Sequence, residues 1–449
     1  MTRIAIIGSG PSGFYAAQEF FKKEPDGYID MFERLPTPFG LLRGGVAPDH
    51  QQMKTLSKLY DRIASHPNFR FFGHVHVGKD VSIDTIRRHY HAVILAVGAE
   101  TDRRLGIPGD DCVGSHTATE FVGWYNGHPD YQSRVFNLNA SVAVVIGQGN
   151  VAVDVVRILA KPVDDLAKTD ITDTAISALR QSRITDIYMI GRRGPAQAAF
   201  TELELTELGK LAGVTVVVHD DLVLSDADSM EMAASSKVRK NITQLEMFKA
   251  SSSIKTPQKT IHLMFYSSPT RIHTDANGHI TGIQCTKTAL MGEAGSQKAI
   301  LTSETYDIPC GIVFRSIGYR GVPLDGVPFN EATHTIPHKN GHVCDQNGQL
   351  FGNVFVTGWI KRGPSGVIGT NRSDSIETVT TCLAALPTLP DPHPLDTPSL
   401  LANHRYVSYA DWQKLDAYEQ SEGIKKGKVR DKVTSAKEAF AVLDNHSHS

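Results

Sequence analysis

The sequence predicts an α/β protein of two domains, each built on a parallel sheet, with the second domain inserted into the first. A short apolar strand, a glycine-rich turn and a helix follow one another at residues 3–23, and the same order recurs at 142–160. A later strand at 354–357 has the spacing of a first-domain piece that returns after an insertion. This internal duplication predicts two Rossmann-like dinucleotide-binding domains, residues 1–103 with 317–449 and residues 104–316.

Each expected element rests on its local pattern: short apolar runs predict buried strands, and the longer segments after glycine turns predict helices. The expected elements of the first domain are strands at 3–7, 28–32, 69–75, 92–97 and 354–357, and helices at 14–23, 49–66 and 371–385. Those of the second are strands at 142–146, 186–190, 261–266, 279–285 and 311–315, with a helix ending near 160. Residues 161–183 look like a polar insertion, and the Ser- and Lys-rich stretch 224–260 is expected to be partly irregular.

Composition excludes several classes of protein. Apolar residues make up 41% of the chain, charged residues 21%, and the formal net charge is -2. Such a composition is ordinary for a globular protein and lacks the basic excess of a nucleic-acid binder, so we expect no nucleic-acid partner. No apolar run predicts a transmembrane segment. Because the first strand begins directly after Met1, Thr2 and Arg3, we expect a cytoplasmic protein or a mature form that is already trimmed.

The cysteines restrict the redox chemistry. The five are widely spaced, and no two lie within four residues of each other. This spacing excludes a local CxxC redox pair, a four-cysteine zinc motif and a clustered iron–sulfur motif, and we expect no metal site. If electrons pass through this chain, a group other than a thiol must carry them.

The first glycine turn predicts an FAD site. Gly8, Gly10 and Gly13 leave room for the backbone to approach a pyrophosphate, and the helix beginning near Pro11 directs its positive end toward that group. Glu33 ends the second strand about 20 residues after the last glycine, where an acid holds the ribose hydroxyls. A tight turn without a ligand is the alternative interpretation.

The second glycine turn predicts an NADPH site. Gly147, Gly149 and Ala152 form the GxGxxA variant between a strand and a helix. Arg192 and Arg193 stand where the first unit has its acid, and two guanidinium groups would bind a 2′-phosphate. Two solvated surface arginines are the alternative. Two dinucleotide sites in one chain indicate a flavoprotein reductase that holds FAD tightly and exchanges NADPH.

Five stretches carry a resemblance to a known family: Ile7–Ala17, Pro38–His50, Ile146–Ala152, Gly191–Pro195 and Gly358–Thr370. With these residues the chain resembles the adrenodoxin-reductase-like ferredoxin–NADP reductases, over roughly residues 3 to 390. The resemblance implies a two-dinucleotide-binding flavoprotein, an oxidoreductase of the EC 1.18.1 class. It would pass electrons from NADPH through FAD to a ferredoxin or similar iron–sulfur protein, which could in turn feed a cytochrome P450.

The resemblance also implies roles for residues at matching positions. The residues implied in FAD contact are Gly8, Gly10, Pro11, Ser12, Gly13, Glu33, Leu41, Val77, Gly358, Trp359, Gly366, Val367 and Ile368. The residues implied in NADPH contact are Gly147, Gln148, Gly149, Asn150, Val151, Arg192, Arg193, Glu204 and again Gly366. His50 and Glu207 would be the polar catalytic pair near the nicotinamide and the flavin.

Some alternatives remain open from the residues alone. Trp359 could be an ordinary core residue, and His50 a structural histidine at a helix start; hydride transfer itself needs no general base. The candidate basic clusters for an acidic ferredoxin are Lys237, Arg239 and Lys240, Lys361 and Arg362, and the stretch 425–430. An NADPH-dependent flavin oxidase or quinone reductase is the first alternative function, and a non-enzymatic flavoprotein redox sensor is the second.

Overall fold

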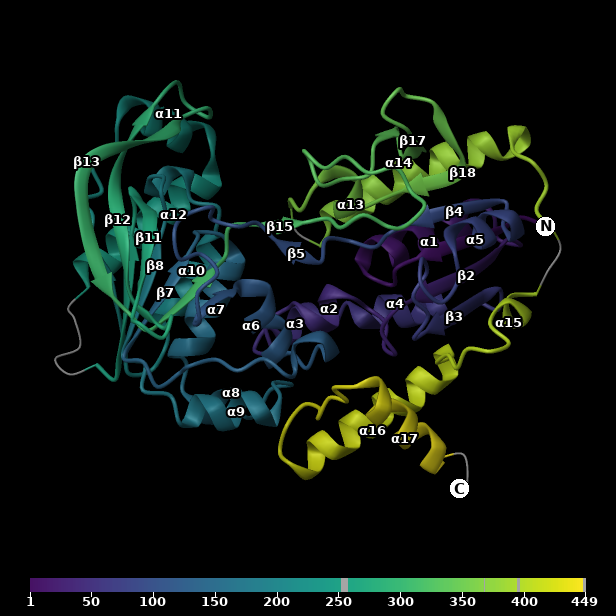
Figure 1. Cartoon of the computed structure of the whole chain (residues 1–449), viewed down its shortest axis with the longest axis horizontal. Coiled ribbons are helices and arrows are strands. Elements are labelled where there is room, and N and C mark those ends of the chain that lie inside the picture. The colour runs from purple at the N-terminus through teal and green to yellow at the C-terminus, as the bar shows by residue number, and fades with distance from the viewer. Residues whose placement is uncertain (252–256, 367, 394–395, 447–449) are drawn as a thin grey trace. The chain divides into compact units, whose positions relative to one another are not determined.

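The structure is a computed structural model of the chain, and it describes residues 1–251, 257–366, 368–393 and 396–446. The chain forms two compact units (Figure 1). Unit 1 comprises Met1–Thr101, Asn126–Pro129 and Gly318–Ser449, and unit 2 comprises Asp102–Tyr125 and Asp130–Ile317. Unit 1 is therefore discontinuous, and all of unit 2 lies between its two main parts along the chain.

Unit 1 is built on a seven-stranded sheet with the strand order β16-β17-β18-β4-β1-β2-β3. The strands are β1 (Arg3–Ile7), β2 (Tyr28–Glu33), β3 (Phe69–Gly73), β4 (Ala92–Leu95), β16 (His338–Lys339), β17 (His342–Cys344) and β18 (Leu350–Val356). The five from β18 to β3 are parallel, and β16 and β17 add an antiparallel edge. The late strand β18 thus pairs with β4, as the sequence predicts for a returning segment.

Helices cover both faces of this sheet, because alternate strand residues are apolar on each side. The helices of unit 1 are α1 (Pro11–Lys23), α2 (Leu41–Gly44), α3 (Gln51–Lys54), α4 (Ser57–Ala64), α5 (Ile83–His89), α13 (Trp359–Arg362), α14 (Thr370–Ala385), α15 (Thr397–Leu400), α16 (Tyr409–Lys425) and α17 (Ala436–His446). One face packs against α1, α4, α14, α16 and α17. The other face packs against α5, α13 and α15. Helices α16 and α17 lie side by side (Figure 1).

Unit 2 is built on a six-stranded parallel sheet with the order β6-β14-β7-β8-β10-β9. Its strands are β6 (Ser115–Thr117), β7 (Val142–Ile146), β8 (Asp186–Ile190), β9 (Val214–Val218), β10 (Lys259–Met264) and β14 (Ile312–Arg315). A three-stranded antiparallel sheet packs on one face and consists of β11 (Ser267–Thr274), β12 (Ile280–Met291) and β13 (Lys298–Pro309).

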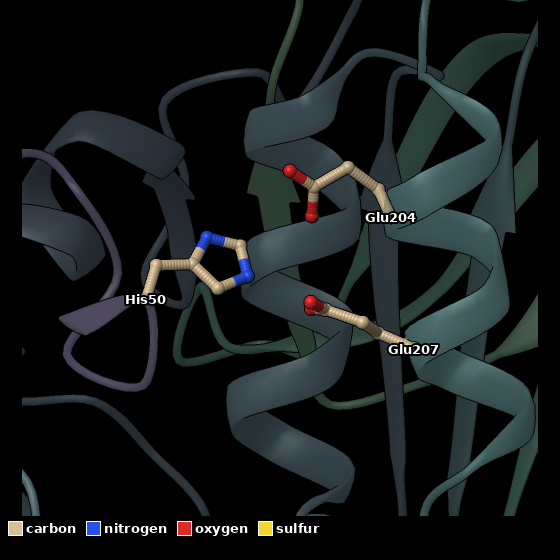
Figure 2. Close-up of side chains that lie close together, drawn as sticks. All are labelled: His50, Glu204 and Glu207. Carbon is tan, nitrogen blue, oxygen red and sulfur yellow. The ribbon is translucent and has the colours of Figure 1, made fainter. Parts of the chain in front are cut away.

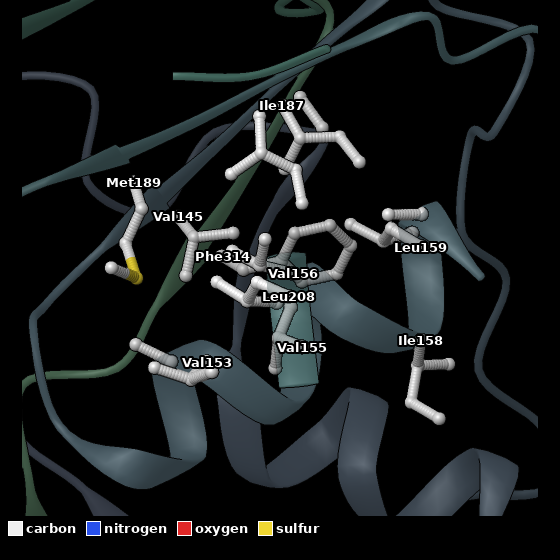
Figure 3. Close-up of a cluster of buried hydrophobic side chains, with 14 of the residues drawn as sticks. Val145, Val153, Val155, Val156, Ile158, Leu159, Ile187, Met189, Leu208 and Phe314 are labelled. Atoms are coloured by element: carbon white, nitrogen blue, oxygen red, sulfur yellow. The ribbon is translucent and has the colours of Figure 1, made fainter. Parts of the chain in front are cut away.

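The opposite face of the parallel sheet packs against helices. They are α6 (Ala118–Tyr125), α7 (Asn150–Ala160), α8 (Val163–Leu166), α9 (Asp173–Arg180), α10 (Glu202–Gly209) and α12 (Ser236–Ala250). Helix α11 (Asp226–Ala234) packs against α12. Figure 3 shows part of this core, where Val153 and Val156 of α7 pack near Val145 of β7. Because α7 carries apolar residues on its inner side, this packing fixes the helix that follows the second glycine turn.

The two units repeat one backbone arrangement at their glycine turns. In unit 1 the N–H of Gly8 donates to the carbonyl oxygen of Phe32 at 2.8 Å. In unit 2 the N–H of Gly147 donates to the carbonyl oxygen of Ile190 at 2.9 Å. The strand registers agree, because Ile7 pairs with Phe32 as the end of β7 pairs with Ile190. Glu33, which follows the acceptor Phe32, and Gly191, which follows the acceptor Ile190, are therefore at equivalent positions in the two units.

One local expectation was wrong, because the helix expected at 49–66 is two helices, α3 and α4. In the stretch 161–183, which looks like a polar insertion, α8 and α9 contribute buried side chains to the core of unit 2. In the stretch 224–260, expected to be partly irregular, residues 226–234 and 236–250 form α11 and α12, each with a serine side chain at its N-cap. None of the described helices has the length and apolar character needed to cross a membrane.

Candidate functional site

The first candidate site is the turn that joins β1 to α1 in unit 1. Gly8 has a φ of +102°, and a Cβ added there would lie 2.5 Å from the carbonyl oxygen of Ala96. A Cβ on Gly13 would collide with the carbonyl oxygen of Gly8. Gly10 differs, because a Cβ there would meet no atom of the described residues within 4 Å. The space beside Gly10 is where an anionic group could reach the backbone.

The start of α1 adds donors to this space. Pro11 is the first residue of the helix and Gly10 is its N-cap, and no side chain in the described residues caps it. The N–H groups of Ser12 and Gly13 therefore have no partner within the helix. Together with the positive end of the helix dipole, these amides suit a bound pyrophosphate.

Glu33 lies beside the same turn, at the end of β2. Its Oε2 accepts hydrogen bonds from the Ser9 N–H at 3.1 Å and from the Ser9 hydroxyl at 2.7 Å. Its Oε1 accepts from the N–H of Leu35 at 3.0 Å. These bonds hold the half-buried carboxylate at the carboxyl edge of the sheet, where it could accept from ribose hydroxyls.

A second segment of unit 1, which begins at Gly358, lies against the start of α1. A Cβ on Gly358 would collide with the hydroxyl of Ser12, and the Gly358 N–H donates to Asp374 at 2.5 Å. The Ser375 hydroxyl donates to the carbonyl oxygen of Ser12 at 3.0 Å. Trp359 follows, and its buried Nε1 has no hydrogen-bond partner among the described residues. An indole N–H left unpaired in this way suits a ligand that brings an acceptor.

The loop before α14 contains the remaining residues expected along a flavin. Gly366 is exposed, and the carbonyl oxygen of Ile368 accepts from the N–H of Asn371 at 3.2 Å and from its Nδ2 at 3.0 Å. Val367 lies outside the described residues. Gly369 is the N-cap of α14, again without a side-chain cap in the described part of the chain. The loop thus ends at the positive end of a helix, which favours negative charge nearby.

Leu41 and Val77 also lie close to the first turn. Leu41 begins α2, and a Cβ on the preceding Gly40 would lie 2.9 Å from the Cα of Gly10. Val77 is buried, two residues after Val75, whose N–H donates to the carbonyl oxygen of Glu33 at 2.8 Å. Unit 1 therefore brings Ser12, Glu33, Gly358 and the start of α2 at Leu41 to one glycine turn.

The second candidate site is the turn that joins β7 to α7 in unit 2. Gly147 has a φ of +136°, and a Cβ there would collide with the carbonyl oxygen of Ser316. Gly149 is the N-cap of α7, and a Cβ on it would meet no described atom within 4 Å. Asn150 begins the helix and accepts from the N–H of Thr201 at 3.0 Å. This arrangement again leaves a helix start and open space beside its middle glycine.

Gln148 distinguishes the second turn from the first. Its side chain covers Gly191, where a Cβ would collide with it, and its Nε2 donates to the carbonyl oxygen of Met264 at 3.0 Å. Gly191 is in register with Glu33, so unit 2 has no carboxylate at the place where unit 1 has one. Gln148 fills that place instead.

Arg192 and Arg193 follow Gly191 directly and are exposed. Their backbones are held, because the Arg192 carbonyl accepts from the Thr288 hydroxyl at 2.6 Å and the Arg193 carbonyl from the Tyr266 N–H at 3.1 Å. No ion pair or side-chain hydrogen bond of the two arginines is found among the described residues. A rigid backbone with two available guanidinium groups suits a phosphate monoester.

Glu204 and Glu207 leave the same side of α10 (Figure 2) and share one cation within unit 2. Arg157 of α7 is 1% exposed, and its Nη1 lies 3.0 Å from Glu204 and 3.5 Å from Glu207. Its Nη2 lies 2.7 Å from Asp154. Three carboxylates thus surround one buried guanidinium, which fixes α10 against the helix of the glycine turn.

His50 belongs to unit 1 and Glu207 to unit 2. His50 is the N-cap residue of α3, half-buried, and its N–H donates to the carbonyl oxygen of Ala47 at 3.0 Å. It is also the last residue of the stretch Pro38–His50, which carries the family resemblance. The pairing of His50 with Glu207 stays a prediction.

The three candidate basic clusters make bonds within their own units. Lys361 is buried and lies 2.6 Å from Asp374 and 2.5 Å from Glu377. Lys237 donates to the carbonyl oxygen of Ala199 at 2.7 Å. In the stretch 425–430, Lys425, Lys426, Lys428 and Arg430 form ion pairs with acids of the same C-terminal segment, namely Glu422, Asp431, Asp416 and Glu419. Much of this positive charge therefore has a structural use.

Sequence reasoning missed two features of these sites. The first is Arg157, whose signal is a single cation in the otherwise apolar inner face of 150–160. The second is the contact between Gln148 and Gly191, for which the sequence carries no signal because it depends on the register of β7 and β8.

The chain is similar over nearly its whole length to proteins of known activity, although no protein-family model matches it. NADPH-ferredoxin reductase FprA of Mycobacterium leprae is 42% identical over 456 residues, 98% of each chain. The mitochondrial NADPH:adrenodoxin oxidoreductase of Arabidopsis thaliana is 39% identical over 462 residues, 98% of this chain and 95% of that one. The solved structure of Mycobacterium tuberculosis FprA in complex with NADPH matches this chain with a TM-score of 0.92 and 40% sequence identity. The match covers 98% of this chain and 99% of that one. The predicted α/β fold class is confirmed.

Proposed function

The chain belongs to the adrenodoxin-reductase-like ferredoxin–NADP reductases, and on that basis we propose that it is an FAD-dependent NADPH:ferredoxin oxidoreductase. It takes a hydride from NADPH and delivers single electrons to a small iron–sulfur protein. FAD supplies the conversion between a two-electron donor and a one-electron acceptor. The two glycine turns bind the two nucleotides.

Unit 1 is the proposed FAD-binding domain. Its support is the open space beside Gly10, the uncapped start of α1 and the carboxylate of Glu33 held at the edge of the sheet. The amides at the start of α1 bind the pyrophosphate, and Glu33 accepts from the ribose hydroxyls. The start of α14, after Gly366 and Ile368, stabilises negative charge near the flavin ring, and Trp359 supplies its unpaired indole N–H.

Unit 2 is the proposed NADPH-binding domain. The residues Gly147 to Val151 bind the pyrophosphate at the start of α7. Arg192 and Arg193 bind the 2′-phosphate, because they follow the position where an NADH site would need an acid. Glu204, held by Arg157, orients the nucleotide from α10.

His50 and Glu207 are proposed to act beside the nicotinamide and the flavin. Hydride transfer requires no proton abstraction, so these residues position the reacting rings and adjust the local charge. Arg157 neutralises part of the charge on Glu207. The proposed compartment is the cytoplasm, for which the five free cysteines give support.

One observation carries the proposal: the same backbone position holds Glu33 in unit 1 and Gly191, followed by two arginines, in unit 2. An acid at the end of the second strand suits a ribose with free hydroxyls, and two arginines there suit a ribose with a 2′-phosphate. This difference supports two sites for two different dinucleotides. The test is NADPH-driven cytochrome c reduction by the purified flavoprotein with and without an oxidised ferredoxin. Strong stimulation by ferredoxin is expected. Fast NADPH oxidation without any ferredoxin effect would favour the flavin oxidase or quinone reductase instead, and absence of bound flavin would overturn the proposal.

A further inference from the structure

The segment Phe39–Gly44 forms one wall of the first glycine turn. The Phe39 N–H donates to the carbonyl oxygen of Ser9 at 3.0 Å, and a Cβ on Gly40 would lie 2.9 Å from the Cα of Gly10. Phe39 has a φ of +85°, a conformation that a bulky residue keeps only when its surroundings hold it. The conformation of Phe39–Gly44 therefore depends on the residues that pack against the side of this segment that faces away from the glycine turn.

Helix α16 packs against this segment from the C-terminal part of the chain. Trp412, Leu415 and Glu419 recur at helical spacing on one face of α16, and all three are buried. The Trp412 ring meets the Phe39 ring edge-on at 5.7 Å between centroids. The guanidinium of Arg43 lies 5.2 Å from the centre of the Trp412 ring.

Glu419 is the charged residue of this face, and its carboxylate is fully buried. It pairs with Arg43 through two hydrogen bonds, one of them 2.8 Å, and with Arg430 at 3.0 Å. It also accepts from the N–H of Val433 at 2.9 Å. Burial acts to raise the pKa of this carboxyl, but the charge and hydrogen bonds of Arg43 outweigh it and the pKa is lowered. The carboxylate is thus charged and holds Arg43 directly.

Lys432 adds a further bond from the same C-terminal segment. It is buried, and its Nζ donates to the carbonyl oxygen of Arg43 at 3.3 Å and to that of Asn126 at 3.0 Å. Both the side chain and the backbone of Arg43 are therefore held by residues close to the C-terminus of the chain.

We propose that the α16–α17 segment serves FAD binding, with Glu419 as a positioning residue that sets the segment Phe39–Gly44 against the flavin site. This inference rests on the proposed function, because it assumes that the first glycine turn binds FAD. Glu419 acts through Arg43, while Trp412 of the same helix face packs on Phe39. A buried ion pair is a poor choice for stability alone, since apolar residues of similar volume often serve as well or better.

The test compares Glu419→Gln with Asp444→Asn in the full-length chain. Asp444 pairs with Arg405 in the same C-terminal part of the chain, and that pair is exposed. After removal of the flavin, each apoprotein is titrated with FAD, and its melting temperature and the midpoint potential of the reconstituted flavin are measured.

We expect Glu419→Gln to raise the dissociation constant of FAD by about 10-fold or more, since it weakens a fully buried charge pair. The flavin potential should shift as well, and the preference for NADPH over NADH should stay as in the wild type. Asp444→Asn should bind FAD within about twofold of the wild type. A dissociation constant and a potential unchanged in Glu419→Gln would overturn the inference.

Arg43→Met keeps the test decisive if Glu419→Gln fails to fold. It retains an unbranched apolar stem beside Trp412 and leaves Glu419 paired with Arg430. It should weaken FAD binding in the same way, and wild-type binding by this variant would also overturn the inference. If the wild-type protein itself binds no FAD, the proposed function fails. If the wild-type protein binds FAD and both variants bind it with the same affinity, only the positioning role of Glu419 fails.

Discussion

The side chain of Gln148 covers Gly191 so closely that a Cβ on Gly191 would collide with it. At the equivalent place in unit 1, Ser9 donates to the carboxylate of Glu33. The two units therefore have the same backbone arrangement at their glycine turns but differ in one pair of side chains. Unit 1 has the Ser9 hydroxyl beside the carboxylate of Glu33, whereas unit 2 has the Gln148 amide beside Gly191. This difference determines where a ribose hydroxyl can find an acceptor, and the first predictions follow from it.

Replacing Arg192 and Arg193 together by alanine should raise the KM for NADPH by about 10- to 100-fold, because two charge-assisted contacts to the 2′-phosphate are lost. The KM for NADH should change by less than about threefold, since NADH carries no such phosphate. Steady-state kinetics with both nucleotides checks this. Arg271→Ala, an exposed arginine on β11, serves as the control and should leave both values unchanged.

Gly10→Ala and Gly149→Ala should each block one nucleotide without disturbing the fold. Neither glycine has a positive φ, and an added Cβ would meet no described protein atom within 4 Å at either position. Any loss of binding therefore reports the close approach of a ligand. Gly10→Ala should lose bound flavin, whereas Gly149→Ala should keep its flavin and bind NADPH at least about 10-fold more weakly.

The two glycine variants are controls for each other. Flavin content by absorbance and NADPH binding by titration are measured on both, together with their melting temperatures. If both variants kept flavin and bound NADPH as the wild type does, the assignment of the two turns would be wrong.

Asp30→Asn should destabilise unit 1 by about 2–4 kcal/mol at pH 7. Asp30 is 1% exposed and accepts from Arg70 at 2.8 Å and from the Tyr90 hydroxyl at 2.6 Å. Burial acts to raise its pKa, but hydrogen bonds from Arg70, Thr397 and Tyr90 outweigh burial and lower it below the ordinary 3.8. Its stabilising contribution is therefore present above pH 3.8 and is lost as the pH falls through the lowered folded-state value.

Scanning calorimetry of Asp30→Asn and the wild type across this pH range checks the sign. The difference in stability should shrink as the solution becomes more acidic than the ordinary pKa of the carboxyl. Asp84→Asn removes the exposed pair with Arg87 and should cost less than about 1 kcal/mol at any pH. A difference that grew on acidification would contradict the account.

His50→Gln and Glu207→Gln should each slow flavin reduction by less than about 100-fold, because hydride transfer needs no general base. Both changes keep a polar side chain of similar size. Single-turnover reduction by NADPH under anaerobic conditions separates this step from binding. A loss of several thousandfold in either variant would indicate direct proton transfer by that residue.

Much of the fold could be predicted because its signals are local. The apolar strand before Gly8 and the one before Gly147 are short, and each ends at a glycine that must adopt a positive φ. The return of β18 to the first sheet was predictable from one apolar strand followed by a glycine-rich loop.

The rest of the molecule could not be predicted because its signals are long-range or compositional. Glu419 and Arg43 lie 376 residues apart in sequence, and nothing near either residue indicates the other. Helix α11 is polar, and a serine N-cap marks its beginning. Helix α12 also begins at a serine N-cap, but its buried Ile242, Leu245 and Phe248 recur at helical spacing. The partners of Arg157 on α7 could not be predicted either, because α10 brings two carboxylates to it from about 50 residues away in sequence.

The most direct test of the central claim is anaerobic stopped-flow reduction of the purified protein by NADPH and by NADH, followed by mixing with an oxidised ferredoxin. The account predicts rapid bleaching of a bound flavin by NADPH, much slower bleaching by NADH, and rapid return of the flavin colour as ferredoxin takes up electrons. Equal rates with the two nucleotides would contradict the role of Arg192 and Arg193, and a reduced flavin that ferredoxin leaves unchanged would contradict the proposed activity.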